Sequence, residues 1–142
     1  LYAAGYVQDA LKEYAEARCV HALVRGEALP EPEALHVPYP AYLNGLAEAV
    51  GELRRYILDA LRRGDASRCE EILQIMDDIY VVLVTMDFPD ALTANLRRTT
   101  DVTRSIIEKT RGDLTYALQQ RELEKALGEF ERRVMESRGP ED

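Results

Sequence analysis

Apolar residues recur at helical spacing along most of the chain, and this pattern predicts an all-α protein. In residues 39–63 one apolar stripe, three or four residues apart at each step, consists of Tyr42, Leu46, Ala49, Leu53, Tyr56, Ile57 and Ala60. No stretch alternates apolar and polar residues over the length of a useful strand. We therefore expect a helical bundle of about five to six helices.

Glycines, prolines and polar clusters mark where these helices end. The blocks expected to be helical are residues 2–25, 39–63, 66–86, about 89–111 and 113–134. Gly64 suits a C-terminal cap, and Ser67 with Glu70 resembles a capping box. Pro89 suits a first helical turn, and Gly112 either breaks the last long block or lets it bend. Residues 26–38 contain three prolines and form a surface connection.

Two of the apolar patterns are unusual. Residues 66–86 are apolar nearly all round, which predicts a buried central helix despite the strand propensity of residues 79–84. Near the C-terminal end, a stripe formed by Leu114, Leu118, Leu123, Leu127, Phe130 and Val134 is long for a terminal element. We expect this stripe to pack on another helix or on another subunit.

Composition bounds the class of protein. A chain of 142 residues with 46% apolar and 31% charged residues suits one soluble domain spanning residues 1–142. No apolar run approaches the roughly 20 residues of a membrane span. The chain begins with Leu1 in a sequence that already looks helical, so we expect the N-terminal helix to be truncated.

Charge and cysteine usage narrow the class further. The net charge of −8 argues against wide, nonspecific contact with a nucleic-acid backbone. Nucleic acid remains compatible as a partner if the acidic residues are clustered and the basic side chains line another face. Cys19 and Cys69 form no CxxC pair, so we interpret them as reduced, half-buried cysteines of an intracellular, cytoplasmic protein.

Acidic residues gather at two places that are suited to chemistry. Glu48 and Glu52 are four residues apart, which places their carboxylates about 40° apart around a helix axis. The small residues Gly45, Ala49 and Gly51 beside them allow another helix, a metal or a substrate to approach the backbone.

The first helix carries the second acidic group. Asp9, Glu13 and Glu16 fall within about 60° of one another, among apolar residues such as Val20 and Val24. Burying unpaired carboxylates costs several kcal/mol per ion, so an arginine, a proton or a metal ion must compensate.

Both acidic groups lie in motifs that resemble a known family. Residues 11–17 (LKEYAEA) and 41–53 (AYLNGLAEAVGEL) are similar to the two acidic motifs of translin-associated factor X, a branch of the translin superfamily. The resemblance covers residues 8–88, including Asp78, and is loose afterwards. The short connection at residues 26–38 resembles archaeal or bacterial members.

The resemblance implies an all-helical protein that assembles into a barrel-like homo-oligomer, which we expect to be an octamer. It also implies binding of single-stranded RNA, with DNA as an alternative, and Mg²⁺-dependent endoribonuclease activity. Position by position, the catalytic and metal-binding acids of the family correspond to Glu13, Glu16, Glu48 and Glu52. Glu48 replaces an aspartate of the family pattern, which keeps the charge and lengthens the arm.

The residues themselves are compatible with this chemistry. Mg²⁺ or Mn²⁺ prefers carboxylate oxygens, activates water and neutralises phosphate oxygens, and one of the four glutamates would accept the proton of the attacking water. A di-iron bundle would need a Glu-x-x-His motif, which neither His21 nor His36 completes. Weaker candidates for phosphate contacts are Arg54, Arg55 and Arg62.

Two other interpretations stay open. One is a translin-like oligomer that binds single-stranded RNA or DNA without cutting it. The other is a structural helical oligomer in which each acid is solvated or paired locally, as Glu52 with Arg55 and Glu13 with Lys12.

Overall fold

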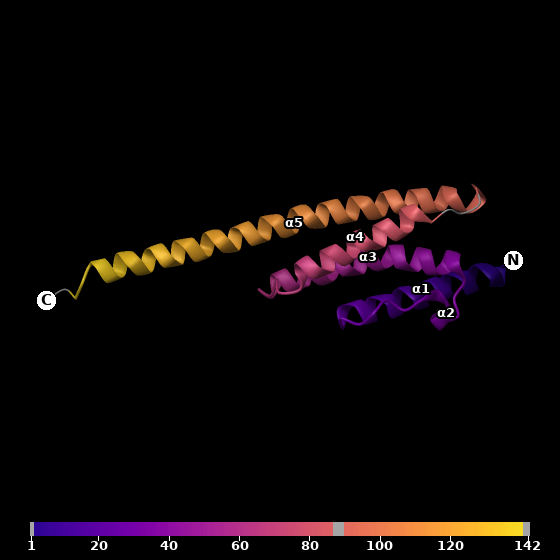
Figure 1. The fold of residues 1–142 in the computed structure, drawn as a ribbon, viewed down its shortest axis with the longest axis horizontal. Helices are drawn as coiled ribbons and strands as arrows, with labels where there is room; N and C mark the ends of the chain where they lie inside the picture. The colour runs from indigo at the N-terminus through magenta and orange to yellow at the C-terminus, as the bar shows by residue number, and fades with distance from the viewer. Residues whose placement is uncertain (1, 87–89, 141–142) are drawn as a thin grey trace.

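The computed structural model describes the backbone of residues 2–86 and 90–140, and the side chains of residues 5–86 and 97–140. Within these residues the chain forms five helices and no strand. They are α1 (Tyr2–Val24), α2 (Pro32–Leu35), α3 (Tyr39–Arg62), α4 (Cys69–Thr85) and α5 (Asp90–Ser137) (Figure 1). The predicted all-α bundle is confirmed, and the predicted helix start at Pro89 lies outside the described residues.

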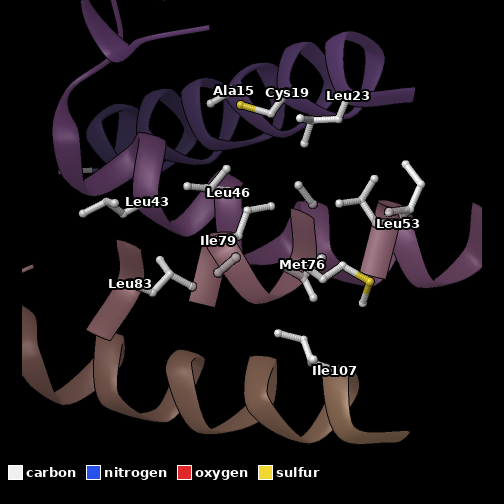
Figure 2. Close-up of a cluster of buried hydrophobic side chains, with 14 of the residues drawn as sticks. Ala15, Cys19, Leu23, Leu43, Leu46, Leu53, Met76, Ile79, Leu83 and Ile107 are labelled. Atoms are coloured by element: carbon white, nitrogen blue, oxygen red, sulfur yellow. The ribbon is translucent and has the colours of Figure 1, made fainter. Parts of the chain in front are cut away.

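Helix α3 lies at the centre of the fold because it contacts α1, α4 and α5. Its fully buried residues include Leu46, Ala49, Val50, Leu53 and Ile57. The core side chains of α1 face α3 from one side, while those of α4 and α5 face it from the other (Figure 2). The stripe read from the sequence of residues 39–63 is therefore the centre of the core.

Helices α1 and α3 run in the same direction, as the matching order of their labelled residues shows (Figure 2). Parallel neighbours cannot be joined by a tight turn, so residues 25–38 must return along α1. The short helix α2 lies in this connection, and Leu35 and Val37 bury their side chains in the core. The hydroxyl of Tyr42 donates to the Pro30 carbonyl at 2.8 Å. The sequence pattern predicted the connection but not α2.

The turn between α3 and α4 confirms one predicted cap and corrects another. Gly64 has a φ of +79°, and its N–H donates to the Leu61 carbonyl, as expected of a glycine after a helix. Ser67 does not cap α4. Its hydroxyl and its N–H both donate to Asp65, at 2.7 and 3.1 Å, so a local aspartate turn replaces the predicted capping box.

Arg68, which precedes α4, joins two helix ends. Its guanidinium donates to the carbonyls of Leu23 and Val24, which are among the last carbonyls of α1 and lack intrahelical partners. It also pairs with Glu71, with Nε 3.1 Å from a carboxylate oxygen. Nothing in the sequence pattern indicated this contact, because the residues it joins are about 45 positions apart.

The prediction that residues 66–86 form a helix buried on every side is wrong. Helix α4 buries one face, formed by Cys69, Ile72, Leu73, Met76, Ile79 and Leu83. Val81 on the opposite face is 55% exposed and Val84 is 49% exposed. Among the described residues, only those of α3 and α5 pack substantially against α4, so these residues leave an apolar outer face of α4 uncovered.

Helix α5 continues through Gly112, where a break or bend was predicted. Glycine inside a helix destabilises it by roughly 0.5–1 kcal/mol relative to alanine, which neighbouring contacts offset here. The Arg54 guanidinium is 2.8 Å from an Asp113 carboxylate oxygen and donates to the Thr110 hydroxyl at 3.2 Å. Leu114, two residues after the glycine, is buried.

Beyond Leu118, which is partly buried against the core, the apolar stripe of α5 leaves the bundle. The outer half of the helix extends past the ends of the other helices (Figure 1). Leu123 and Leu127 are each 54% exposed, and Phe130 is 65% exposed. The prediction that this stripe packs on another helix or subunit stays a prediction.

Candidate carboxylate site

The site begins with a close contact between α1 and α3. A Cβ atom at Gly45 would lie 2.6 Å from the Lys12 carbonyl oxygen and 3.0 Å from the Glu16 amide nitrogen. Only glycine fits at this distance, so the close approach expected of the small residues is confirmed at Gly45. At Gly51 the same Cβ would meet nothing within 4 Å.

This contact brings Glu16 of α1 close to Glu48 and Glu52 of α3. The pKa of Glu16 is raised from its ordinary value of 4.5 to about 7. Burial is the main cause, followed by a hydrogen bond with Glu48 and by the negative charges of Glu48 and Glu52. Two carboxyl groups in such contact favour a proton or a cation between them, so Glu16 is partly protonated near neutral pH.

Lys12 supplies a positive charge that the sequence analysis did not assign. Its Nζ lies 3.1 Å from a Glu48 carboxylate oxygen and 3.9 Å from Asp9. The hydrogen bond with Glu48 is the main cause of a raised pKa of Lys12. Sequence spacing relates Lys12 to its neighbour Glu13. The contact with Glu48 joins two helices, so no local sequence signal indicates it.

Glu13 joins the site through an open cavity of about 520 Å³. The cavity is lined by Glu13, Glu16, Ala17, Val20, His21, Val24, Arg25 and Glu52. Three of the four predicted glutamates therefore face one space. Glu48 lies at its edge, where it contacts Glu16 and Lys12.

The kind of donor present suits a hard divalent cation. Carboxylate oxygens from two helices are the ligands that Mg²⁺ and Mn²⁺ prefer, and a raised carboxyl pKa marks a place where added positive charge is favourable. Among the described side chains, however, no three Asp, Glu, His or Cys groups are already arranged to hold a metal ion. Binding therefore requires side-chain rotation and the release of Glu48 by Lys12.

The three predicted phosphate-binding arginines lie in different surroundings. Arg54 faces α5 and is paired with Asp113. Arg55 lies 3.6 Å from Glu52, and Arg62 lies 3.6 Å from Asp59, both within exposed pairs one helical turn apart. Their role in binding nucleic acid stays a prediction.

The remaining candidates are structural or exposed. Asp78 accepts a hydrogen bond from Gln74 at 3.0 Å, within α4. Cys19 and Cys69 are free, and both are fully buried instead of half-buried. Burial raises the pKa of Cys19 to about 11, which makes its thiol unreactive at neutral pH.

The fold and the site together define a class: an all-helical protein in which two parallel helices share an acidic cleft. Comparison with known sequences makes the assignment specific. The sequence profile of the translin family matches residues 3–121, and the chain belongs to this family. The predicted superfamily membership is confirmed.

Relatives agree with this assignment. An uncharacterized protein of Methanocaldococcus jannaschii is 32% identical over 124 residues, which cover 87% of this chain and 55% of that protein.

No described helix is long and apolar enough to pass through a membrane.

Solved structures show the same fold. The structure of AfC3PO is 38% identical in sequence to this chain, with a TM-score of 0.68. The structure of its complex with duplex RNA is 40% identical, with a TM-score of 0.70. Each match covers 80% of this chain and 60% of the solved chain. Apo-NeC3PO gives 25% identity and a TM-score of 0.68, over 75% of this chain and 56% of the other. The chain thus spans little more than half the length of the proteins it matches.

Proposed function

We propose that the chain is the catalytic part of a divalent-metal-dependent endoribonuclease that cleaves single-stranded RNA. The observation that carries the proposal is the raised pKa of Glu16 between two further glutamates on a neighbouring helix. Glu13, Glu16, Glu48 and Glu52 would hold Mg²⁺ or Mn²⁺. Such a cation activates a water molecule and neutralises developing charge on the phosphate when it is bound.

The chain's own residues contribute in distinct ways. A carboxyl group with a pKa of about 7 suits a proton acceptor at neutral pH, so Glu16 would take the proton of the attacking water. Lys12 neutralises Glu48 until a cation takes its place, and Gly45 fixes the distance between the two helices. Arg55, 73% exposed beside Glu52, would contact the RNA backbone.

RNA as the substrate is supported by the solved complex of AfC3PO, which contains duplex RNA. For this chain we propose an unpaired strand as the substrate. Its net charge of −8 leaves few basic side chains to contact the phosphates of two backbones. The rival function is binding of single-stranded RNA or DNA without cleavage.

A cleavage assay separates these functions. With labelled single-stranded RNA and Mn²⁺, Glu52→Gln should lower the cutting rate by at least about 100-fold, because loss of even an outer partner of a metal ligand costs about 10–100-fold, while EDTA should abolish cutting by the natural chain. Glu122→Gln is the matched control, because Glu122 is an exposed glutamate on α5. Undiminished cutting by Glu52→Gln would contradict the proposal, and binding without any cutting would establish the rival.

We further propose that the chain assembles into a homo-oligomer, with an octamer as the expected state. The apolar residues left exposed on α4 and α5, such as Val81, Leu127 and Phe130, support this proposal, because such residues on neighbouring helices suit a protein interface. Light scattering should show Phe130→Glu as a smaller species. Gln120→Glu, which adds the same charge to an exposed site on the same helix, should leave the assembly unchanged.

A further inference from the structure

The cavity at the carboxylate site extends well past the acids. Beyond Glu16 it is lined by the apolar residues Ala17, Val20 and Val24, and by His21 and Arg25. Four of these five residues belong to α1, and Arg25 directly follows the last residue of the helix. We call the part of the cavity lined by these five residues the α1 trough.

Helical geometry explains how the trough is built. Glu13, Ala17, Val20 and Val24 are spaced four, three and four residues apart, so their side chains form one row along α1. His21 and Arg25 are themselves four apart and form a second row beside the first. The sequence therefore places an acidic residue at one end of the row and apolar residues along the rest of it. The His21 imidazole and the Arg25 guanidinium lie along one side.

The side chains of the trough are available to a ligand. Ala17 and His21 are exposed, and Val20 and Val24 are partly exposed. The Nε of Arg25 pairs with Glu27 at 2.8 Å, and the guanidinium has further N–H groups to donate. Its side chain is 60% exposed.

The apolar row, the His21 imidazole and the Arg25 guanidinium match the parts of one nucleotide in an RNA strand. A nucleobase has apolar faces and a polar edge, and its flanking phosphates are anionic. The volume of about 520 Å³ lies within the roughly 300–1,000 Å³ typical of small-molecule sites. Val24, the last residue of α1, lies about 12 Å along the helix axis from Glu16, and Arg25 follows it, so the strand can continue from the acids to the guanidinium.

We propose that the α1 trough binds the base of the nucleotide next to the scissile phosphate. The base lies on Val20 and Val24, the His21 ring borders its edge, and Arg25 contacts the following phosphate. The apolar floor offers no fixed donor or acceptor, so the trough accepts any base and sets the position of the cut rather than its sequence. This inference rests on the proposed nuclease function, which supplies the scissile phosphate.

The test uses binding, so that it does not depend on cleavage. A short single-stranded oligoribonucleotide is prepared with one abasic nucleotide at successive positions. Its affinity for the natural chain is measured by fluorescence anisotropy in Ca²⁺. We expect one position at which loss of the base weakens binding by at least about fivefold, because the contact between the base and the trough is lost there.

Two matched variants locate the effect. Ala17 and Ala10 are both exposed alanines on α1, and only Ala17 lines the cavity. Ala17→Leu should fill the trough, weaken the intact RNA by about fivefold and remove the sensitivity to the abasic nucleotide. Ala10→Leu, with the same change in helix propensity, should keep the natural profile. His21→Ala should reduce the sensitivity to the abasic nucleotide, and Arg25→Ala should lower the salt dependence of binding by about one phosphate contact.

The outcomes separate this inference from the nuclease proposal. Equal penalties at every abasic position, or a natural profile in Ala17→Leu, would overturn the trough as a base site. If RNA is bound with the expected profile but is never cut with Mn²⁺, the trough stands as a base site of a binding protein and the nuclease proposal falls. If RNA is cut but the profile is flat, only the trough is overturned.

Discussion

The pairing of α1 with α3 and the outer half of α5 show what the same apolar spacing produces in two settings. Leu53 of α3 is fully buried, whereas Leu127 of α5 is 54% exposed, although both belong to regular helical stripes. The difference is the presence of a neighbouring helix. A stripe in the sequence therefore indicates which side of a helix is apolar, but not what covers it.

The two regions also differ in how closely backbones approach. At Gly45 the helices touch, and this contact holds glutamates together that would otherwise separate. The outer half of α5 has no such neighbour, since only its earlier residues, such as Ile107 and Leu114, enter the core. The closely packed helices α1 and α3 thus contain the carboxyl group with the raised pKa, whereas the outer half of α5 presents an exposed apolar face for assembly.

The largest expected effect comes from truncating one leucine in each region. Leu53→Ala should lower the free energy of unfolding by about 3–5 kcal/mol at every protein concentration, because it leaves a cavity in the core. Leu127→Ala should lower it only through assembly, so its effect should shrink on dilution. Denaturant titrations at several concentrations measure both. A concentration-independent loss in Leu127→Ala would show that α5 is covered within the chain.

The second prediction concerns pH. Because the folded pKa of Glu16, about 7, exceeds its ordinary 4.5, the folded chain keeps a proton that the unfolded chain releases between these values. Raising the pH through this window should therefore destabilise the metal-free protein. It should also strengthen Mn²⁺ binding by up to about tenfold per pH unit, because the ligand must lose that proton. Calorimetry from pH 5 to 8 measures the affinity.

The variant Glu16→Gln is the control for the pH prediction, since it cannot titrate at this position. Its Mn²⁺ affinity should be low and nearly independent of pH in the same window. His21 lines the same cavity, so His21→Gln should be measured in parallel. A slope that disappears in His21→Gln and persists in Glu16→Gln would assign the proton to the histidine instead.

A smaller effect is expected at the helix contact itself. Gly45→Ala should destabilise the fold by about 1–3 kcal/mol, because the added methyl group meets the backbone of α1 and cannot be accommodated by side-chain movement. It should also weaken Mn²⁺ binding by separating Glu16 from α3. Gly51→Ala is the matched control, since open space surrounds that position. Thermal unfolding of the two variants should move in opposite directions.

The smallest effect is expected where the two halves of α5 meet. A Cβ atom at Gly112 would contact nothing within 4 Å, so Gly112→Ala should stabilise the protein by roughly 0.5–1 kcal/mol. Thermal unfolding measures the gain. A loss of stability would mean that α5 needs to bend at this glycine in the assembled protein.

Much of the fold followed from local sequence rules. The limits of α1 and α3 and the turn at Gly64 depend on residues close together in the chain, and these were predicted. The continuity of α5 was not, because Arg54 and Asp113 stabilise it across 59 positions. Helix α2 was missed as well, since four residues are too few to show a period.

The candidate site was also predicted only in part, because local spacing relates residues within one helix but not residues on two helices. Helical spacing placed Glu48 with Glu52 and Glu13 with Glu16, and the motif resemblance related the two pairs. The pairing of Lys12 with Glu48 and the extension of the cavity to Arg25 depend on how α1 and α3 pack. Such contacts between helices have no local signature in the sequence.

The length of α5 has a consequence for any assembly of this chain. At 1.5 Å per residue its 48 residues span about 72 Å, and the helix is continuous. It therefore acts as a rigid spacer between whatever binds its outer end and the bundle that its earlier residues enter. Inserting or deleting seven residues, which is nearly two full turns, would move the docked partner by about 10.5 Å and rotate it by only about 20°, so the distance between the bundle and the partner is encoded in residue number.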